Sequence, residues 1–512
     1  MSTYHSYAEY YHDLTKYTPE GVASSKHNID FDKQPEPYKN YPRKKNIDIS
    51  YLLPLDKNPF SDVGIKNPND FTPLEKSLSE VSKLLYFSNG VTAIMQHADK
   101  PFYMRSSPSA GGLYPTEIYV VSLDYPGLDN GVYNYQVLQH TLCKLYDGNL
   151  KDKLQEALFK HPLAEQAKLF LILTGVFYRS SWRYQDRAYR RICLDTGHVL
   201  GNIDLISDQC GFKAGLIGGF QDKLVNEILL LDDEEEQALA VVALIDKDIQ
   251  SDTDFPRALP SGLDSKNMKT PEGIRLIQLH SRSRIEKFVK VPNFQEENID
   301  EKFKFSSRIA FEDSPQGFKW KQNIFPTIMR RRSTRAFSGE SITKEELGSL
   351  LDFTYHSECF GKDGFDPKPD YFDLSLIQTF IGINSVDGLE EGCYFYNVSG
   401  RFLRQVRFKN FRDDIYYLCL GQELGHRASA VIFHTADLSK AVFKYGERAY
   451  RYLHMDAGHL GERLNIAAVN LKLGVSGIGG FFDDQVNELL GIPESEAVIY
   501  VTTLGKPAKP VV

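Results

Sequence analysis

The sequence predicts an α+β protein built from two tandem copies of one domain. The first observation is an internal repeat with a constant offset, since 448 − 187 = 261 and 459 − 198 = 261. The residues that recur are Tyr184, Arg187, Asp195, Gly197 and His198, followed by Tyr445, Arg448, Asp456, Gly458 and His459. The second observation is that β-type apolar runs alternate with helical patterns in both halves. A register without gaps over about a hundred residues indicates duplication of a whole domain, unlike the short period of a solenoid.

The same elements are expected in each half. A helix with a capping box begins each domain, at Ser77-x-x-Glu80 in the first and Thr343-x-x-Glu346 in the second. A long amphipathic helix carries the Arg-Ala-Tyr-Arg and Asp-x-Gly-His motifs, and a short helix follows at 483–491. Strands are predicted at 117–123, 169–176, 238–245, 430–436 and 496–504. We expect an N-terminal extension over 1–60, a first domain over 61–250, a connecting segment over 251–322 and a second domain over 323–512.

The composition of the 512 residues is globular, with 42% hydrophobic and 12% aromatic residues and a net charge of −8. The negative charge argues against binding to nucleic acid or to an anionic membrane. No apolar run approaches the roughly 18 residues of a membrane helix, and the polar N-terminus lacks the apolar region of a signal peptide. Six scattered cysteines without a CxxC pair predict reduced thiols, a cytoplasmic location and no zinc site. His454 and His459 are five residues apart, off one helical face, so we expect no metal.

Five motifs occur in a fixed order on this duplicated frame. They are Tyr-His-x-x-Thr-Lys at 11–16, Ser-Pro-Ser-Ala-Gly-Gly-Leu-Tyr-Pro at 107–115, Arg-Arg-Ser-x-Arg at 331–335, Lys-Tyr-Gly-Glu-Arg-Ala-Tyr-Arg at 444–451 and Gly-Gly-Phe at 479–481. Together they resemble the FMN-dependent nitroreductase superfamily, in particular its azoline-dehydrogenase branch of SagB/ThcOx type, which makes thiazoles and oxazoles in modified peptides. The resemblance covers most of residues 70–245 and 325–510.

The resemblance implies a fold and an activity. Each half would be a nitroreductase-like, three-layer α+β unit with a mixed sheet. In that family two units pair about a two-fold axis, and FMN lies in the interface and passes a hydride through its N5 atom. The two tandem halves would therefore form an intramolecular pseudo-dimer.

The resemblance also implies which residues hold the flavin. One unit supplies a basic segment and C-terminal basic residues, here Arg331, Arg332, Ser333, Arg335, Lys506 and Lys509. The partner unit supplies a small-residue loop, here Ser107, Pro108, Ser109, Ala110 and Gly111. The backbone of Ile478, Gly479 and Gly480 would face flavin N5. Arginine suits the phosphate end because its guanidinium group binds two oxygens at once and stays charged.

Each of these elements occurs once, although the domain occurs twice. Counted from the predicted helix starts (343 − 77 = 266), Arg330–Arg335 corresponds to 64–69, "GIKNPN", which has lost nearly all its charge. The first half also lacks a Gly-Lys-Pro after its last strand, and the second half has bulky and acidic residues near 367–381 in place of the small-residue loop. The losses are complementary, so we expect one FMN per chain.

Two Lys/Arg-Tyr pairs are candidates for catalysis. Lys444-Tyr445 matches the Lys-Tyr pair that azoline dehydrogenases use near the flavin, whereas the first half has Arg183-Tyr184. Arginine cannot act as a base at neutral pH, so Tyr184 is the candidate if only the first-half copy faces the flavin. Because His198 and His459 are both retained, we expect them to be interior structural histidines, and we expect the Arg-Ala-Tyr-Arg pairs to serve the interface between the halves.

The substrate stays open at this point. The alternatives are azoline dehydrogenation in a modified peptide, NAD(P)H-driven reduction of a small nitro or quinone compound, and flavin binding without turnover. Residues 1–60 could recruit a peptide. The chain is expected to be a monomeric pseudo-dimer or a higher homo-oligomer.

Overall fold

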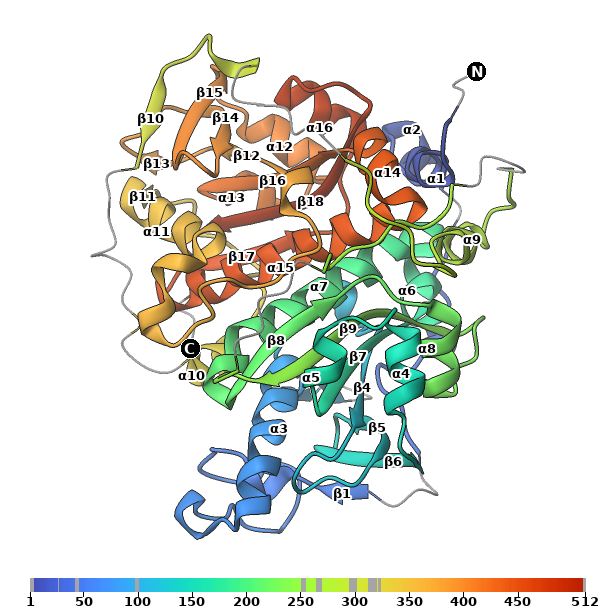
Figure 1. The fold of residues 1–512 in the computed structure, drawn as a ribbon. Helices are drawn as coiled ribbons and strands as arrows, with labels where there is room; N and C mark the ends of the chain where they lie inside the picture. Colours follow the sequence, from blue (N-terminus) through green and yellow to red (C-terminus); the bar gives the residue numbers. More distant parts are fainter. Residues whose placement is uncertain are drawn as a thin grey trace.

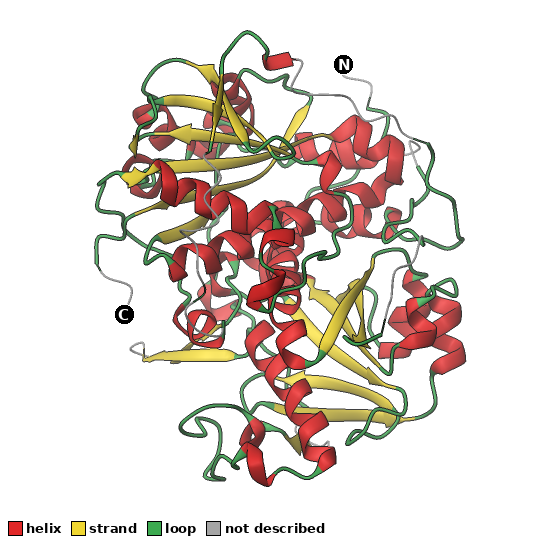
Figure 2. Ribbon diagram, turned by 60° about the vertical axis from the view of Figure 1, so that its left-hand side comes forward, coloured by secondary structure: helices red, strands yellow, loops and turns green. Residues whose placement is uncertain are grey.

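Two seven-stranded sheets stand at opposite ends of the molecule, with long helices packed between them (Figures 1 and 2). This arrangement comes from a computed structural model, which describes residues 4–25, 27–41, 46–96, 101–249, 255–263, 269–293, 302–311, 320 and 324–509. Parts of the expected connecting segment lie outside these residues.

The two sheets have the same strand order. In space the first runs β1 (Asn46–Asp48), β6 (Thr141–Asp147), β5 (Gly131–Gln136), β4 (Thr116–Ser122), β7 (Leu169–Val176), β9 (Glu236–Asp246) and β8 (Phe212–Ile217). The second runs β10 (Arg308–Ala310), β15 (Phe402–Arg407), β14 (Gly392–Asn397), β12 (Gln378–Ile383), β16 (Ala430–Asp437), β18 (Glu496–Gly505) and β17 (Gly474–Ile478). The five strands predicted from the sequence are all present.

Every strand pair in these two sheets is antiparallel, so the expectation of a mixed sheet is wrong. Short connections such as those between β4, β5 and β6 permit only antiparallel neighbours. Two small sheets complete the strands, a hairpin of β2 (Val91–Gln96) with β3 (Pro101–Arg105) and a parallel pair of β11 (Ile342–Thr343) with β13 (Val386–Asp387).

Helices cover both faces of each sheet, which gives the three layers. The outer helices are α4 (Lys151–Ala157), α5 (Leu163–Gln166) and α8 (Asp222–Leu229) in the first half, and α12 (Arg412–Leu418), α13 (Glu423–Arg427) and α16 (Asp483–Leu490) in the second. The inner layer contains α3 (Pro73–Asn89), α7 (Ala188–Ser207), α11 (Lys344–Tyr355) and α15 (Ala449–Asn470). Four further helices are α6 (Phe177–Tyr184), α9 (Arg275–Arg282), α10 (Phe325–Arg330) and α14 (Leu438–Tyr445).

Helices α7 and α15 lie side by side at the centre of the molecule (Figure 1). We expected them to be amphipathic, but every residue of α7 is buried, because the helix lies between its own sheet and the other half. Glycine permits the close crossing. A Cβ atom on Gly197 would lie 2.1 Å from Met455 O, and one on Gly458 would lie 2.2 Å from Leu194 O. The glycine of each Asp-x-Gly-His motif therefore serves the contact between the two helices.

One predicted helix start is wrong. Helix α11 has the expected capping box of Thr343 and Glu346, but α3 begins five residues earlier than predicted, with Thr72 and Glu75 as its capping box. Pro73 at the first helical position favours this start. With the corrected offset of 343 − 72 = 271, Arg330–Arg335 corresponds to 59–64, which contains neither lysine nor arginine. The loss of positive charge in the first half is thus complete.

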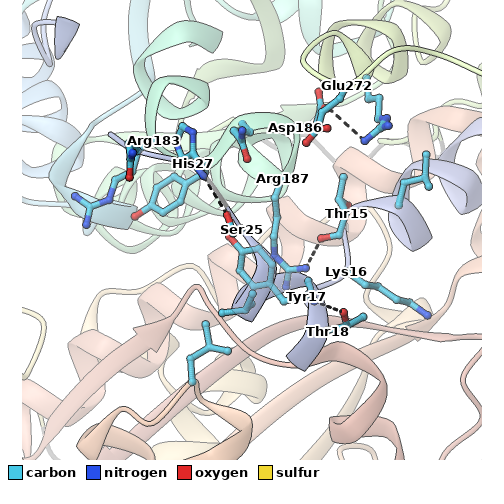
Figure 3. Close-up of a pocket in the computed structure, with 18 residues that line it drawn as sticks. Thr15, Lys16, Tyr17, Thr18, Ser25, His27, Arg183, Asp186, Arg187 and Glu272 are labelled. Atoms are coloured by element: carbon cyan, nitrogen blue, oxygen red, sulfur yellow. Dashed lines mark hydrogen bonds and ion pairs between the residues drawn. The ribbon is translucent and has the colours of Figure 1, made fainter. Parts of the chain in front are cut away.

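The N-terminal segment crosses the boundary between the halves. Helix α1 (Tyr7–Leu14) starts on Glu447 of the second half, whose carboxylate accepts hydrogen bonds from Tyr7 N (2.9 Å) and Ala8 N (2.7 Å). Its Tyr11 hydroxyl donates to the first-half Asp186 carbonyl. The residues that follow, including α2 (Pro19–Ser24), form one wall of a cavity (Figure 3).

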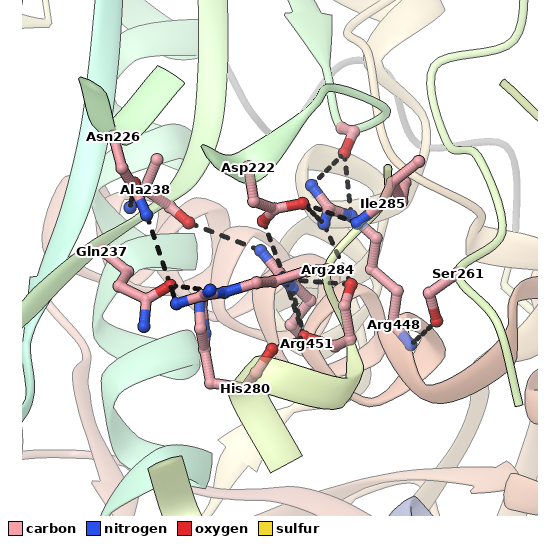
Figure 4. A network of polar contacts seen from close by, with 12 residues as sticks. Asp222, Asn226, Gln237, Ala238, Ser261, His280, Arg284, Ile285, Arg448 and Arg451 are labelled. Carbon is pink, nitrogen blue, oxygen red and sulfur yellow. Dashed lines mark hydrogen bonds and ion pairs between the residues drawn. The ribbon is translucent and has the colours of Figure 1, made fainter. Parts of the chain in front are cut away.

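The halves are joined by two equivalent buried ion-pair clusters. Asp222 at the start of α8 accepts hydrogen bonds from Arg448 (2.6 Å) and Arg451 (3.1 Å) of the second half (Figure 4). Asp483 at the start of α16 accepts them from Arg187 (2.8 Å) and Arg190 (2.7 Å) of the first half. Because 483 − 222 = 261, this is one contact made twice. It confirms that the Arg-Ala-Tyr-Arg motifs serve the interface.

No helix formed by the described residues is long and apolar enough to cross a membrane.

Replacing Asp222 with alanine should destabilise the fold by about 3–5 kcal/mol, because two buried arginines lose their shared anion. Urea denaturation measures this change. The control is Asp414→Asn, which removes a partner from the exposed Lys409–Asp414 pair and should cost far less. Equal losses in the two variants would contradict a structural role for the buried cluster.

Candidate functional site

A glycine-containing loop of the first half forms one side of the candidate site. Asp195 of α7 holds this loop, since its carboxylate accepts hydrogen bonds from Ser109 Oγ (2.5 Å) and Ala110 N (3.2 Å). Gly111 has a φ of 67°, and a Cβ atom there would lie 2.8 Å from the Tyr184 hydroxyl. Only glycine combines this backbone with so close a neighbour.

The basic segment of the second half lies against this loop. Buried Arg331 crosses to the first half, where its Nε donates to Ser106 O (2.7 Å) and its Nη2 to Arg105 O (3.0 Å), immediately before Ser107 and Pro108 of the loop. Arg332 donates to Thr92 Oγ1 of β2 (3.2 Å). The structure therefore brings the two predicted elements together from opposite halves.

The C-terminal basic residues lie beside the same segment. Ser338 N donates to Lys506 O (2.9 Å), and Ala508 N donates to Ala336 O (2.9 Å), so the chain end runs along residues 336–338. Arg332, Arg335, Lys506 and Lys509 form no ion pair with any described residue. Burial and neighbouring Arg331 lower the pKa of Arg332. A group of cations without anionic partners is suited to binding a phosphate.

The third element is the turn after β17 in the second half. Gly477 is exposed and Gly479 and Gly480 are half-buried, whereas Ile478 points into the core. Within the described part of the chain, no backbone carbonyl accepts a hydrogen bond from Gly479 N or Gly480 N. Arg191 fixes the turn, because its Nη2 donates a hydrogen bond to Gly479 O (2.7 Å). These N–H groups are therefore available to a ligand. We call the loop, the basic segment and this turn the open site.

Tyr184 belongs to the open site, but Lys444 and Tyr445 do not. The Tyr184 ring lies against the guanidinium of Arg191, with 3.9 Å from Cζ to the ring centroid. Burial raises the pKa of Tyr184, an effect that Arg191 and Arg183 partly offset. Lys444 Nζ instead contacts Asp373 at 2.6 Å, and the Tyr445 hydroxyl donates to the same carboxylate (2.9 Å).

Asp373 belongs to the counterpart of the glycine loop, and this second site is closed. Phe372 N (3.0 Å) and Asp373 N (2.8 Å) donate to Asp456, just as the glycine loop does to Asp195. The Phe372 ring fills the space over the glycine turn, because a Cβ atom on Gly218 would lie 2.5 Å from it.

Polar groups complete the closure. Asp370 accepts a hydrogen bond from Leu216 N (3.1 Å), and Gly218 N donates to Arg257 O (2.6 Å) of the connecting segment. The groups that are available at Gly479 and Gly480 are thus engaged or covered at Gly218 and Gly219. We call this arrangement the closed site.

A cavity of about 810 Å³ adjoins the open site (Figure 3). Its lining includes Tyr17, Tyr184 and Leu420. Tyr184 approaches Gly111, and Leu420 and Tyr17 lie 2.7 and 3.8 Å from the position of a Cβ atom on Gly480. The cavity therefore leads to the loop and the turn. The sequence motif at 11–16 signalled the importance of this segment, but not that its own Thr15 and Lys16, with the residues that follow, line a cavity.

Gln185, beside Tyr184 in the cavity wall, has a strained backbone. Its φ is 49° and its ψ is −138°, while its counterpart Gly446 has nearly the same backbone with φ 62° and ψ −153°. This backbone conformation costs free energy for any residue other than glycine. Such strain is typical of functional sites.

The histidines that occur in both halves are buried and hydrogen-bonded, as expected for structural residues. His198 Nδ1 bonds to Leu194 O (2.7 Å) and its Nε2 to the Tyr500 hydroxyl (3.2 Å), and burial lowers its pKa to about 4. His459 Nε2 bonds to Asp204 (3.2 Å). Among the described residues, no group of His, Cys, Asp or Glu side chains could hold a metal ion.

Residues 82–244 and 328–506 both match the nitroreductase family. The chain therefore belongs to this family and is a nitroreductase-family oxidoreductase with two copies of the fold.

Individual relatives agree with this assignment. A nitroreductase-family protein of Anabaena variabilis is 46% identical, and its solved structure has a TM-score of 0.89 over 98% of this chain and 100% of its own. The nitroreductase-like protein MJ1384 of Methanocaldococcus jannaschii is 31% identical over 180 residues, which are 35% of this chain and 87% of that protein. The microcin B17-processing protein McbC of Escherichia coli is 28% identical over 144 residues, 27% of this chain. This chain spans about half of McbC, 52% of its length. The similarity to McbC agrees with the SagB-type branch.

Replacing Gln185 with glycine should raise the free energy of unfolding by about 1 kcal/mol, because relief of backbone strain outweighs the entropy of glycine. Chemical denaturation measures it. The reciprocal Gly446→Ala should destabilise the protein, since its Cβ atom would lie 2.3 Å from Ser261 O. A destabilised Gln185→Gly variant would contradict strain at this position.

Proposed function

We propose that the protein is an FMN-dependent oxidoreductase that binds one FMN per chain in the open site. The observation that carries this proposal is the contrast between two equivalent sites. At one, uncompensated cations, a glycine loop and free backbone N–H groups converge from both halves. At the other, Phe372 and the connecting segment fill the corresponding space.

The residues of the open site have distinct proposed roles. Arg332, Ser333, Arg335, Lys506 and Lys509 would hold the phosphate, while Arg331 ties the basic segment to the first half. The loop from Ser107 to Gly111 would lie along the ring system, and Gly479 N and Gly480 N would donate to its N5 edge. When bound, FMN supplies a carrier that takes up or releases a hydride at N5.

Tyr184 favours reduction as the direction of the reaction. A tyrosine hydroxyl is protonated at neutral pH, and burial raises the pKa of Tyr184 further, so Tyr184 can donate a proton to a substrate being reduced but is a poor base. This supports NAD(P)H-driven reduction of a small nitro or quinone compound bound in the adjoining cavity. Lys444 and Tyr445 are not proposed as catalytic residues, because they are engaged with Asp373 at the closed site.

Azoline dehydrogenation in a modified peptide is the second candidate. The similarity to McbC, whose name connects it with processing of microcin B17, supports it. The cavity of about 810 Å³ behind the N-terminal segment has room for a heterocycle and its neighbours. In this direction Tyr184 would have to accept a proton, since the first half has Arg183 where the second has a lysine.

Purified protein reconstituted with FMN should contain one flavin per chain. Arg335→Ala and Lys506→Ala should each raise the Kd for FMN about tenfold, because each removes one charged phosphate contact. Absorbance gives the ratio and fluorescence quenching the Kd. Lys213→Ala, on β8 of the closed site, is the control and should leave the Kd unchanged. A ratio near two would contradict the closed site, and unchanged Kd values would contradict the phosphate assignment.

Tyr184→Phe should lower turnover on the order of a hundredfold, the usual contribution of a general acid or base. The assay is anaerobic bleaching of FMN by NADPH followed by reoxidation with a quinone or nitro compound. Bleaching by an azoline peptide without NADPH would favour the second candidate instead. Tyr445→Phe, at the equivalent position of the closed site, is the matched control. If neither NADPH nor an azoline peptide bleached the flavin, the protein would bind FMN without turnover.

A further inference from the structure

Positions 191 and 452 are equivalent by the repeat, and they distinguish the open from the closed site. Arg191 Nη2 donates to Gly479 O at 2.7 Å, and the Tyr452 hydroxyl donates to Gly218 O at 2.9 Å. Since 452 − 191 = 261 and 479 − 218 = 261, both side chains hold the same carbonyl of the same turn. Gly218 O also accepts hydrogen bonds from Arg448 (2.8 and 3.1 Å), but Arg448 is paired with Asp222, so a positive charge without an ion-pair partner is bonded to this carbonyl only at the open site.

The charge of Arg191 has no anionic partner. The side chain is 4% exposed and forms no ion pair with any described residue. It also makes a long hydrogen bond to Arg187 O (3.4 Å) and faces the rings of Tyr184 (3.9 Å) and Tyr17 (6.0 Å), and its buried Nε has no hydrogen-bond partner. That Nε lies 3.3 Å from where a Cβ atom on Gly479 would be, so the uncompensated charge sits against the turn itself.

Asp195 is the nearest acidic candidate, and it does not compensate this charge. Its carboxylate is occupied by Ser109 and Ala110 of the glycine loop. Burial raises its pKa to about 7, although Ser109, Ala110 and the charge of Arg191 act in the opposite direction, and among the described residues Asp195 forms no ion pair with Arg191. The next carboxylate along the interface, Asp483, is taken by Arg187 and Arg190.

Burying a cation without an anion is costly, and an equivalent neutral residue already exists in the molecule. At the closed site, neutral Tyr452 and an Arg448 that is neutralised by Asp222 hold the same carbonyl, so the turn can be held without an uncompensated charge. The uncompensated charge of Arg191 is therefore explained if negative charge develops beside it during the reaction.

We propose that Arg191 sets the reduction potential of the flavin by stabilising the negative charge that the ring acquires on reduction. The inference rests on the proposed function. A hydride donor such as NAD(P)H breaks a C–H bond and loses two electrons with that hydrogen, and an N–H bond forms at N5. The ring is left with one extra negative charge, which a fixed cation beside the N5 turn stabilises. Arg191 thus acts electrostatically and is not required to touch the substrate.

The test uses Arg191→Tyr, which installs the residue of the closed site and keeps the hydrogen bond. In the FMN-loaded protein, equilibrium reduction against a reference dye should show the ratio of reduced to oxidised flavin falling about tenfold at a fixed potential. For a two-electron couple this equals a midpoint about 30 mV lower. Arg191→Lys, which keeps the charge, should stay closer to the unmodified protein, and Tyr452→Phe at the closed site should leave the midpoint unchanged.

A second measurement does not need the flavin. The apoprotein of Arg191→Tyr should have a higher Tm than the unmodified apoprotein, because an uncompensated buried charge has been removed. An Arg191→Tyr protein that binds FMN with an unchanged midpoint would overturn the proposal, as would an apoprotein whose Tm falls. If the unmodified protein bound no FMN at all, the proposed function itself would fail, so the two failures are distinguishable.

Discussion

The buried Asp–Arg clusters between the halves are the contact on which the rest of the structure depends. Asp483 lies only a few residues after the glycine turn of the second half, and it is bound by Arg187 and Arg190 at the start of α7. The same helix carries Asp195, which holds the glycine loop. One ion-pair cluster therefore sets the position of the turn relative to the loop. The packing of α7 against α15 and the hydrogen bonds of Arg331 join the halves as well, but this cluster is the one that lies between the turn and the loop helix.

The two ion-pair clusters are equivalent, but the residues that pack around the two glycine turns differ. Asp222 positions the turn at Gly218 in the same way, but at this site side chains of the protein fill the space over the turn. Phe372 stacks on Tyr452 with ring centroids 4.7 Å apart, and the Lys444–Asp373 pair beside it is largely buried. The scaffold of both sites was retained, while the side chains that would hold a ligand were replaced at one of them. This separates scaffold from function: residues present in both halves support the fold, and residues present in one half distinguish the open site.

The sequence predicted the duplication, the strands and the interface motifs, because these depend on local periodicity and on a repeat that can be counted. The complementary loss of the basic segment and the small-residue loop also pointed to a single site. The start of α3 was harder, because Thr72-x-x-Glu75 and Ser77-x-x-Glu80 both fit a capping box, and only Pro73 separates them. The choice between Tyr184 and Tyr445 lay beyond the sequence, since it depends on which loop lies beside which helix in three dimensions. Arg191 could have been found by asking where the two repeats differ in charge.

The closed site also limits how many electrons the protein can hold. Under the proposed function, a chain with one open site stores two electrons at a time, whereas a symmetric pair of sites would store four. A substrate that needs more than two electrons must be served in separate rounds, and the donor has to return to the same cavity between them. Because Phe372 and the connecting segment close the second site, each chain would then work as a single two-electron unit.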